Sequence, residues 1–355
     1  MGLLLVAVSP ILAVPVPSPS HSDVILTMDS LRLSLPDHLP LKPLYKLQVP
    51  AADQLPLCSQ TLQPLWHCLQ TGNQAAPLQA RYEFVKQVYV DSGETTIIDL
   101  YHDSVADTNV VIKKVSKRRF FSEALKDSAY RELSLHRQLQ HINIVQLYDT
   151  TETEEHLLLL LEHVPRHDYF TKKLEELNMP FSVKPNGGVQ KLRSFCFDIL
   201  SALHYLHYHG IMHMDLKPSN LLLQTNVDSN HEYPIVKMCD FGLARQVGSD
   251  GHLTLPWKCG SDQYRAPEVK DGASVSCKVD MWSFGIFLHR LSVGFRPHDL
   301  AWKPGTPIPF PTRHWRKFAD TGLQDLLSQC LQKDPTLRIS AEEALSHPFL
   351  TSRQL

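Results

Sequence analysis

The sequence predicts an α+β fold with two lobes, in which a small antiparallel sheet with one helix precedes a larger, mainly helical part. Short segments rich in β-branched and aromatic residues, with turn residues between them, run from 82 to 161. Beyond Pro165 the apolar residues recur mostly at helical spacing. The chain has 355 residues, 43% of them hydrophobic and 20% charged, so its length and composition suit one two-lobed domain with a sizeable core.

Residues 1–80 form a proline-rich tail ahead of a predicted domain at 81–350. Eleven of the 25 prolines lie in this tail, and proline at such short intervals excludes a long helix or a central strand. The simplest expectation is a disordered leader. The alternative is a segment that docks on the domain through Leu41 to Val49 or Leu62 to Leu69, which makes the tail a candidate site for a regulatory partner.

The smaller lobe is expected at 81–162 and contains the sheet and one helix. The pattern predicts strands at 82–90, 95–101, 110–114, 144–149 and 157–161, and a helix at 122–139. The larger lobe follows at 163–350, and apolar residues at 192, 195, 199, 200, 203 and 206 give its first helix a continuous stripe. Further helices are predicted at 279–291, 323–331 and 341–345.

Charge and cysteine content exclude several classes of protein. The net charge of −2 gives no support for nucleic acid or a membrane surface as a partner. The seven cysteines show no C-x-x-C spacing, which is typical of reduced thiols in the cytosol or nucleus. No Lys or Arg precedes Arg32 and the apolar runs before it are short, so neither a secretory signal nor a membrane span is expected. The predicted location is cytoplasmic or nuclear.

The stretch from His213 to Asn220 carries the main chemical signal. It places Asp215, Lys217 and Asn220 within six residues, after an apolar helix and before an apolar run. In phosphoryl transfer an Asp can accept the proton of the attacking hydroxyl, a Lys can neutralise the transferring group, and an Asn can hold a metal ion. The three residue types at this spacing therefore point to phosphoryl transfer.

This stretch resembles the catalytic loop H-R-D-L-x-x-x-N of eukaryotic protein kinases, with Met214 in place of the Arg. Other motifs of the family follow in the expected order, and the resemblance covers about residues 82–350. They are V-V-I-K at 110–113, D-F-G at 240–242 and R-A-P-E at 265–268. The wording of the motifs is nearest to the cyclin-dependent and mitogen-activated branch.

The resemblance implies a protein kinase-like fold and ATP-dependent phosphorylation of Ser or Thr in protein substrates, with ATP and Mg²⁺ as cofactors. Asp215, Lys217 and Asn220 would be catalytic, and Asn220 and Asp240 would hold the metal. The residues expected at the ATP site are Gly93, Ile98, Val111, Lys113, Glu132, Glu162, Val164, Leu222 and Asp240. Structural roles are implied for an ion pair of Glu268 with Arg338 and for Asp280, which would brace the catalytic loop.

The sequence departs from the family pattern at the phosphate-binding loop and beside the catalytic Asp. Gly93 is the only glycine of the G-x-G-x-x-G positions, and Asp91 and Glu94 add negative charge where phosphates would bind. Met214 removes an arginine that commonly binds a phosphate on the activation loop. These departures predict weaker nucleotide binding, and they leave a pseudokinase, acting as a nucleotide-binding or scaffold protein, as the alternative.

Overall fold

The computed structural model describes residues 81–121, 123–165, 170–172, 187–225, 233–255, 258–270, 272–294, 296–310, 315, 318 and 321–351. The described residues all belong to one compact unit, Lys46–Leu355. The predicted tail at 1–80 and both of its candidate docking segments lie outside the described residues.

The five predicted strands and the predicted helix are present. The strands are β1 (Tyr82–Val90), β2 (Thr96–Asp103), β3 (Thr108–Ser116), β4 (Leu147–Glu152) and β5 (His156–Glu162), and the helix is α3 (Glu123–His136). They form an antiparallel sheet in the order β1-β2-β3-β5-β4. The fourth strand begins later than predicted, because Ile144 leaves the sheet and forms a parallel bridge with Met238.

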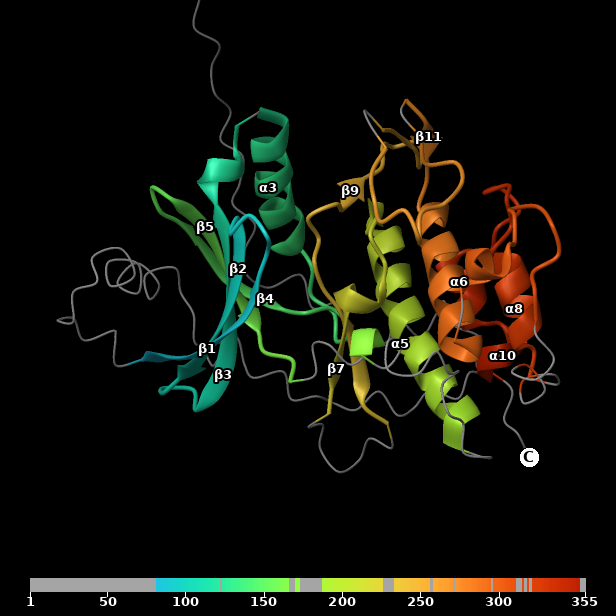
Figure 1. The fold of residues 1–355 in the computed structure, drawn as a ribbon, viewed down its shortest axis with the longest axis horizontal. Coiled ribbons are helices and arrows are strands. Elements are labelled where there is room, and N and C mark those ends of the chain that lie inside the picture. The colour runs from blue at the N-terminus through green and yellow to red at the C-terminus, as the bar shows by residue number, and fades with distance from the viewer. Residues whose placement is uncertain are drawn as a thin grey trace, which may run out of the picture. The chain divides into compact units, whose positions relative to one another are not determined.

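The two faces of this sheet have different surroundings, because successive side chains of a strand point to opposite sides. Residues of α3 such as Ala129 and Leu133 pack against one face (Figure 1). On the opposite face, six buried side chains form what we call the outer sheet cluster. They are Tyr82, Tyr101, Val110, Ile112, Leu158 and Leu160.

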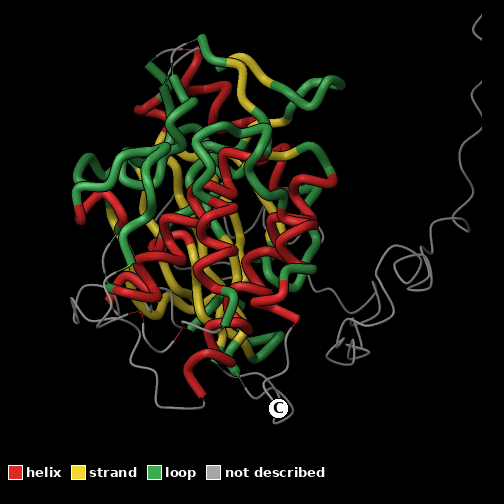
Figure 2. The backbone as a smooth tube through the Cα atoms, turned by 90° about the vertical axis from the view of Figure 1, so that its right-hand side faces the viewer, coloured by secondary structure: helices red, strands yellow, loops and turns green. Residues whose placement is uncertain are grey.

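The larger part of the chain is built around α5, which carries the predicted apolar stripe, and α6, which matches the helix predicted at 279–291. Its elements are α5 (Gly187–Tyr208), β6 (Ile211–Met212), η4 (Pro218–Asn220), β7 (Leu221–Gln224), β8 (Ile235–Met238), β9 (Arg245–Gln246), β10 (Leu253–Thr254), β11 (Ser274–Val275), α6 (Lys278–Val293), η5 (Pro297–Leu300), α8 (Leu323–Cys330), α9 (Ala341–Leu345) and α10 (Pro348–Thr351). A short 3-10 helix, η3 (Lys117–Arg119), precedes α3. Figure 2, seen from the side of α8 and α10, shows the helices in front of the strands.

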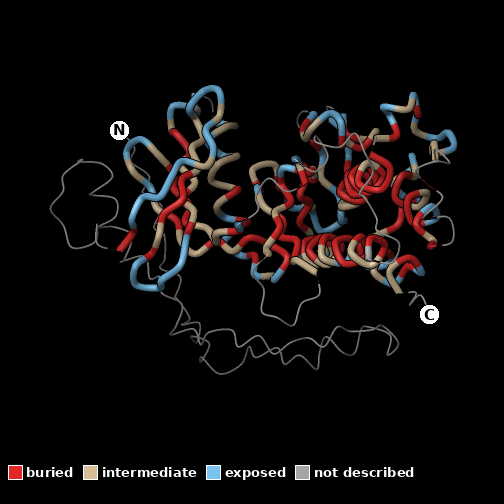
Figure 3. Tube along the Cα trace, turned by 60° about the horizontal axis from the view of Figure 1, so that its bottom comes forward, coloured by how far each residue is buried: buried red, intermediate tan, exposed pale blue. Residues whose placement is uncertain are grey.

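Helix α6 is buried on nearly all sides, which explains why its sequence is apolar without a clear stripe. Figure 3 shows buried positions concentrated along the long helices of this part. Gly285 permits α6 to approach α8, since a Cβ there would lie 2.8 Å from the Leu331 side chain. The predicted ion pair is also present, with Arg338 donating two hydrogen bonds to Glu268 at 2.6 and 3.0 Å. None of the helices within the described ranges combines the length and the hydropathy that crossing a bilayer would require.

Candidate active site

The catalytic-loop stretch connects β6 to β7, and Asp280 of α6 holds its backbone. The Asp280 carboxylate accepts hydrogen bonds from the backbone N–H groups of His213 and Met214, at 2.8 and 2.9 Å. It also contacts His207 at 3.0 Å. Burial alone would raise the pKa of Asp280, but these hydrogen bonds and the nearby histidines hold it below its usual value. The contacts of Asp280 thus match its predicted bracing role, and one of the two residues that it holds, Met214, has a left-handed backbone at φ +68°.

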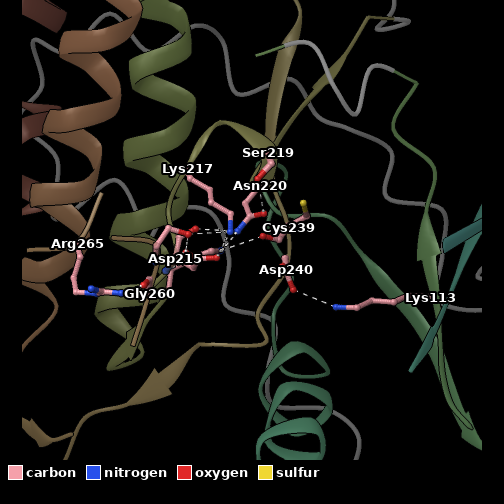
Figure 4. A network of polar contacts seen from close by, with 11 residues as sticks. Lys113, Asp215, Lys217, Ser219, Asn220, Cys239, Asp240, Gly260 and Arg265 are labelled. Atoms are coloured by element: carbon pink, nitrogen blue, oxygen red, sulfur yellow. Dashed lines mark hydrogen bonds and ion pairs between the residues drawn. The ribbon is translucent and has the colours of Figure 1, made fainter. Parts of the chain in front are cut away.

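The Asp215 carboxylate is oriented by four groups of three residues, from two segments. Its Oδ1 accepts hydrogen bonds from the backbone N–H and the hydroxyl of Ser261, at 3.0 and 2.7 Å. Its Oδ2 lies 2.6 Å from the Lys217 ammonium and 3.3 Å from the Asn220 amide nitrogen. Figure 4 shows Lys217 and Asn220 pointing toward Asp215. The three residues predicted to be catalytic are therefore gathered around one carboxylate.

A second charged group lies on the side of the sheet. The Lys113 ammonium on β3 is 2.7 Å from Glu132 on α3 and 3.1 Å from Asp240 (Figure 4). Burial opposes the charge on Lys113, but Asp240 and Glu132 outweigh it and raise the pKa of the lysine. The charge of Lys113 in turn lowers the pKa of Asp240 to about 2. At neutral pH the site therefore presents a fixed cation between two carboxylates.

The residues predicted to hold a metal offer suitable donors. The amide nitrogen of Asn220 donates to the carbonyl and the carboxylate of Asp215, at 2.9 and 3.3 Å, while its oxygen accepts a long hydrogen bond from the Ser219 hydroxyl at 3.4 Å. The Asp240 side chain is 46% exposed, and Lys113 contacts only one of its oxygens. The backbone N–H of Cys239 donates to the carbonyl of Asn220 at 3.0 Å, so the two donors come from neighbouring segments. An amide oxygen and a carboxylate are ligands that fit Mg²⁺.

The charged group around Asp215 and the charged group around Lys113 both line one cavity of about 740 Å³. Most of the predicted ATP-site residues line it as well. They are Ile98, Val111, Lys113, Glu132, Glu162, Val164, Leu222 and Asp240. Gly93 does not line the cavity and is exposed in the turn between β1 and β2.

The turn between β1 and β2 has its own internal support. The Asp91 carboxylate accepts hydrogen bonds from the backbone N–H of Thr95 at 2.6 Å and of Thr96 at 3.0 Å. It accepts a third, at 2.6 Å, from the Thr95 hydroxyl. Glu94 adopts φ +51°, a conformation that favours glycine. The turn therefore closes on a carboxylate, and Asp91 itself lines the cavity.

Sequence reasoning missed an ion pair at the back of the cavity. Lys237 of β8 lies 2.9 Å from Glu162 at the end of β5, and only 8% of the lysine side chain is exposed. The second oxygen of Glu162 also accepts a hydrogen bond from the backbone N–H of Gln146, at 3.1 Å. The pair joins the sheet to the helical part beside the cavity. No motif or spacing signalled it, because the partners are 75 residues apart in the chain.

Three rings pack against one another between α3 and the catalytic loop, one pair tilted and the other edge-on. Phe241 lies between His136 and His213, with ring centroids 4.7 and 5.2 Å away. His136 donates from Nε2 to the carbonyl of Val145 at 2.8 Å, and burial lowers its pKa to about 4. His213 donates from Nε2 to the carbonyl of Cys239 at 3.1 Å. These ring contacts connect the helix that carries Glu132 to the loop that carries Asp215.

Comparison with known proteins agrees with this geometry. The model of the protein kinase domain family matches residues 84–350. A probable myosin light chain kinase of Dictyostelium discoideum is 34% identical over 256 residues, which cover 70% of this chain and 61% of that protein. The serine/threonine-protein kinase PLK4 of Aedes aegypti is 31% identical over 247 residues, which cover 68% of this chain and 30% of that protein. The probable serine/threonine-protein kinase pXi of Dictyostelium discoideum is 30% identical over 237 residues, covering 67% of this chain and 31% of that protein.

The chain thus spans less than two thirds of the length of these relatives. Their names do not decide between branches of the family, so the branch suggested by the motifs stays a prediction. The family match lies inside the predicted domain at 81–350 and includes every site residue named above. With its sheet, its helical part and its charged cavity, the chain belongs to the protein kinase family.

Proposed function

We propose that this protein transfers the γ-phosphoryl group of ATP to serine or threonine hydroxyls of protein substrates. The observation that carries the proposal is one cavity lined by both charged groups, Asp215 with Lys217 and Lys113 with Asp240. One group suits the attacking hydroxyl and the other suits the nucleotide phosphates. The relatives named as serine/threonine-protein kinases support the choice of acceptor.

The residues divide the work as follows in this proposal. Asp215 orients the substrate hydroxyl and accepts its proton, while the new oxygen–phosphorus bond forms and the bond to the leaving ADP oxygen breaks. Lys217, 2.6 Å from Asp215, offsets the negative charge of the transferring group. Lys113, held by Glu132 at 2.7 Å, binds the α- and β-phosphates.

Nucleotide placement falls to the remaining cavity residues. Ile98, Val111 and Leu222 offer apolar surface for the adenine. Glu162 ends β5, and Val164 lies in the connection that follows it. Mg²⁺ held by Asp240 and Asn220 would neutralise phosphate charge when bound. Gly93 is exposed away from the cavity, so its predicted contact with ATP requires the turn to close over the nucleotide.

The test is transfer of labelled γ-phosphate from ATP to a panel of serine, threonine and tyrosine peptides. We expect Asp215→Asn to reduce transfer by about 10² to 10⁴-fold with little change in ATP binding, since an amide cannot take the proton. Lys113→Met should weaken both binding and transfer. Transfer by pure Asp215→Asn protein at the wild-type rate would remove the role assigned to Asp215.

A pseudokinase is the second candidate, and the Asp91 turn is the observation that favours it, because a carboxylate lies where phosphates would approach. Melting in the presence and absence of Mg-ATP separates the two functions when it is read beside the peptide panel. A rise in melting temperature without transfer to any peptide would support a nucleotide-binding scaffold.

A further inference from the structure

The ion pair of Lys237 with Glu162 connects two parts of the cavity lining. Lys237 lies on β8, and its partner in the strand register is Leu222 of β7, which lines the cavity. Glu162 ends β5, and the residues that follow it, 163 to 165, also line the cavity. One lysine therefore links the strand pair that carries Leu222 to the end of β5.

The contact between the two charged groups is close and buried. The Lys237 ammonium lies 2.9 Å from one carboxylate oxygen of Glu162 and 3.0 Å from the other. The side chains are 8% and 15% exposed, respectively. A buried charge is costly to leave without a partner, so the lysine keeps the carboxylate in one place.

The side chain of Glu162 points away from the cavity, so the pair acts on the backbone. Leu159 and Leu161 line the cavity, while Leu158 and Leu160 belong to the outer sheet cluster. Successive side chains of a strand point to opposite faces, so the side chain of Glu162 lies on the side of Leu158 and Leu160. What Glu162 presents to the cavity is therefore its backbone. Backbone N–H and C=O groups are among the few polar groups that orient a ligand in an apolar pocket.

Other hydrogen bonds join β8 to the sheet without the ion pair. The backbone N–H of Val145 donates to the carbonyl of Met238 at 2.9 Å, and the N–H of Met238 donates to the carbonyl of Asn143 at 2.8 Å. The next residue, Gln146, donates from its backbone N–H to the Glu162 carboxylate at 3.1 Å. These bonds should hold the fold together when the ion pair is removed. The ion pair itself is then left to fix the position of the end of β5.

We propose that Lys237 is a positioning residue for the base of the nucleotide. By holding Glu162 from behind, it sets the distance between the backbone at the end of β5 and Leu222, and so the width of the slot for the adenine. This inference rests on the proposed function and deepens it, because it assigns the recognition of the base to a feature outside the catalytic loop.

The phosphate end of the cavity is held by other contacts. The Lys113 ammonium is fixed by Glu132 at 2.7 Å and by Asp240 at 3.1 Å. The backbone N–H of Cys239 donates to the carbonyl of Asn220 at 3.0 Å, which fixes the segment just before Asp240. Loss of the Lys237 pair should therefore weaken binding of the base and leave binding of the phosphates unchanged.

The double variant Lys237→Met, Glu162→Gln tests the inference in the full chain. Removing one partner alone would leave a buried charge unpaired, whereas removing both charges at similar volume is often tolerated. The new amide oxygen at position 162 still accepts the N–H of Gln146. Calorimetric titration uses two probes, adenosine, which has the base and no phosphate, and magnesium tripolyphosphate, which has phosphates and no base.

We expect the affinity for adenosine to fall about fivefold or more, the order of one lost hydrogen bond. The affinity for magnesium tripolyphosphate should stay within about twofold of wild type, because Lys113 and Asp240 keep their contacts. In peptide phosphorylation the KM for ATP should rise while kcat stays within about twofold, which is the result for a group that affects ground state and transition state alike.

The matched control is the double variant Arg81→Met, Asp103→Asn. It also removes a buried ion pair of the sheet, at 2.9 Å with side chains 10% and 1% exposed, and neither residue lines the cavity. It should bind both probes as the wild type does. Equal losses of adenosine affinity in the two double variants would show a general loosening of the sheet and overturn the role of Lys237.

The remaining outcomes separate this inference from the proposed function. Unchanged adenosine affinity in the Lys237→Met, Glu162→Gln protein, with wild type binding both probes, would overturn the role of Lys237 alone. Failure of that variant to unfold cooperatively in urea would also contradict it, because the pair would then hold the fold rather than the base. A wild-type protein that binds neither adenosine nor Mg-ATP would remove the proposed function together with this inference.

Discussion

Gly260 is expected to control the position of the catalytic carboxylate although it bears no functional group. Its φ is +87°, and a Cβ added to it would lie 2.6 Å from the carbonyl oxygen of Met214. Real Cβ atoms essentially never approach other atoms within 3.0 Å, so Gly260→Ala must displace one of the two segments by at least 0.4 Å. Met214 precedes Asp215, and Ser261, which follows Gly260, donates from its backbone N–H and from its hydroxyl to the Asp215 carboxylate. The displacement therefore falls on the hydrogen bonds that orient Asp215.

The size of the effect follows from this geometry. The left-handed backbone alone costs an alanine about 1–2 kcal/mol of stability. A misplacement of ~1 Å can cost about 10²-fold in rate, so a shift of a few tenths of an ångström should lower kcat by about tenfold or more. An added Cβ at Gly260 would meet Met214 and none of Lys113, Glu132 or Asp240, so the KM for ATP should stay within about twofold of wild type.

The assay is steady-state kinetics with a peptide from the panel that the wild-type protein phosphorylates, combined with urea unfolding. Gly272→Ala is the matched control, because Gly272 has φ +70° and no atom within 4 Å of an added Cβ. It should lose similar stability through the backbone alone and keep its kcat. A kcat of Gly260→Ala equal to that of the Gly272→Ala protein would refute the argument that the Met214 contact positions Asp215.

Three further results are expected. Asp91→Asn keeps a hydrogen-bond acceptor for the turn but removes the negative charge from the cavity. It should therefore lower the KM for ATP several-fold and leave kcat unchanged. A change in kcat alone would show that the turn acts on the transferring group. Met214 is buried and supplies no cation for a phosphate on the activation loop. The double variant Ser249→Ala, Thr254→Ala and the phosphatase-treated protein should therefore both retain activity. A loss greater than about tenfold in a peptide assay would contradict this. Burial lowers the pKa of His141 from 6.5 to about 4, so the unfolded chain takes up the proton first and stability falls as the pH drops through that window. His141→Asn should reduce this loss by up to about 3 kcal/mol in urea unfolding at several pH values, whereas an unchanged pH profile would remove the assignment.

Much of the site could be predicted from the sequence because its chemistry resides in short motifs. The spacing of Asp215, Lys217 and Asn220 within one loop is local, and so is the placement of Asp240 after an apolar strand. The Lys113–Glu132 pair could be proposed because a strand and a helix of predictable type carry them. The strands were predictable in type, while their ends shifted by a few residues where tertiary contacts intervened, as at Ile144.

Other features depend on packing between segments that are distant in the chain. The pairing of Lys237 with Glu162 requires β8 to lie beside the end of β5, and no local pattern encodes that arrangement. The β1–β2 turn could be recognised as poor in glycine, but only the folded turn shows that Asp91 closes it.

The two faces of the sheet show the same division between local pattern and packing. Alternation along single strands predicts which residues share a side, but it does not say which side receives α3. The sequence by itself therefore determined the residue types, their local periodicity and the chemistry of the catalytic loop. The tertiary structure decided the pairing of distant charges and which face of the sheet receives α3, because those depend on how separate elements pack together.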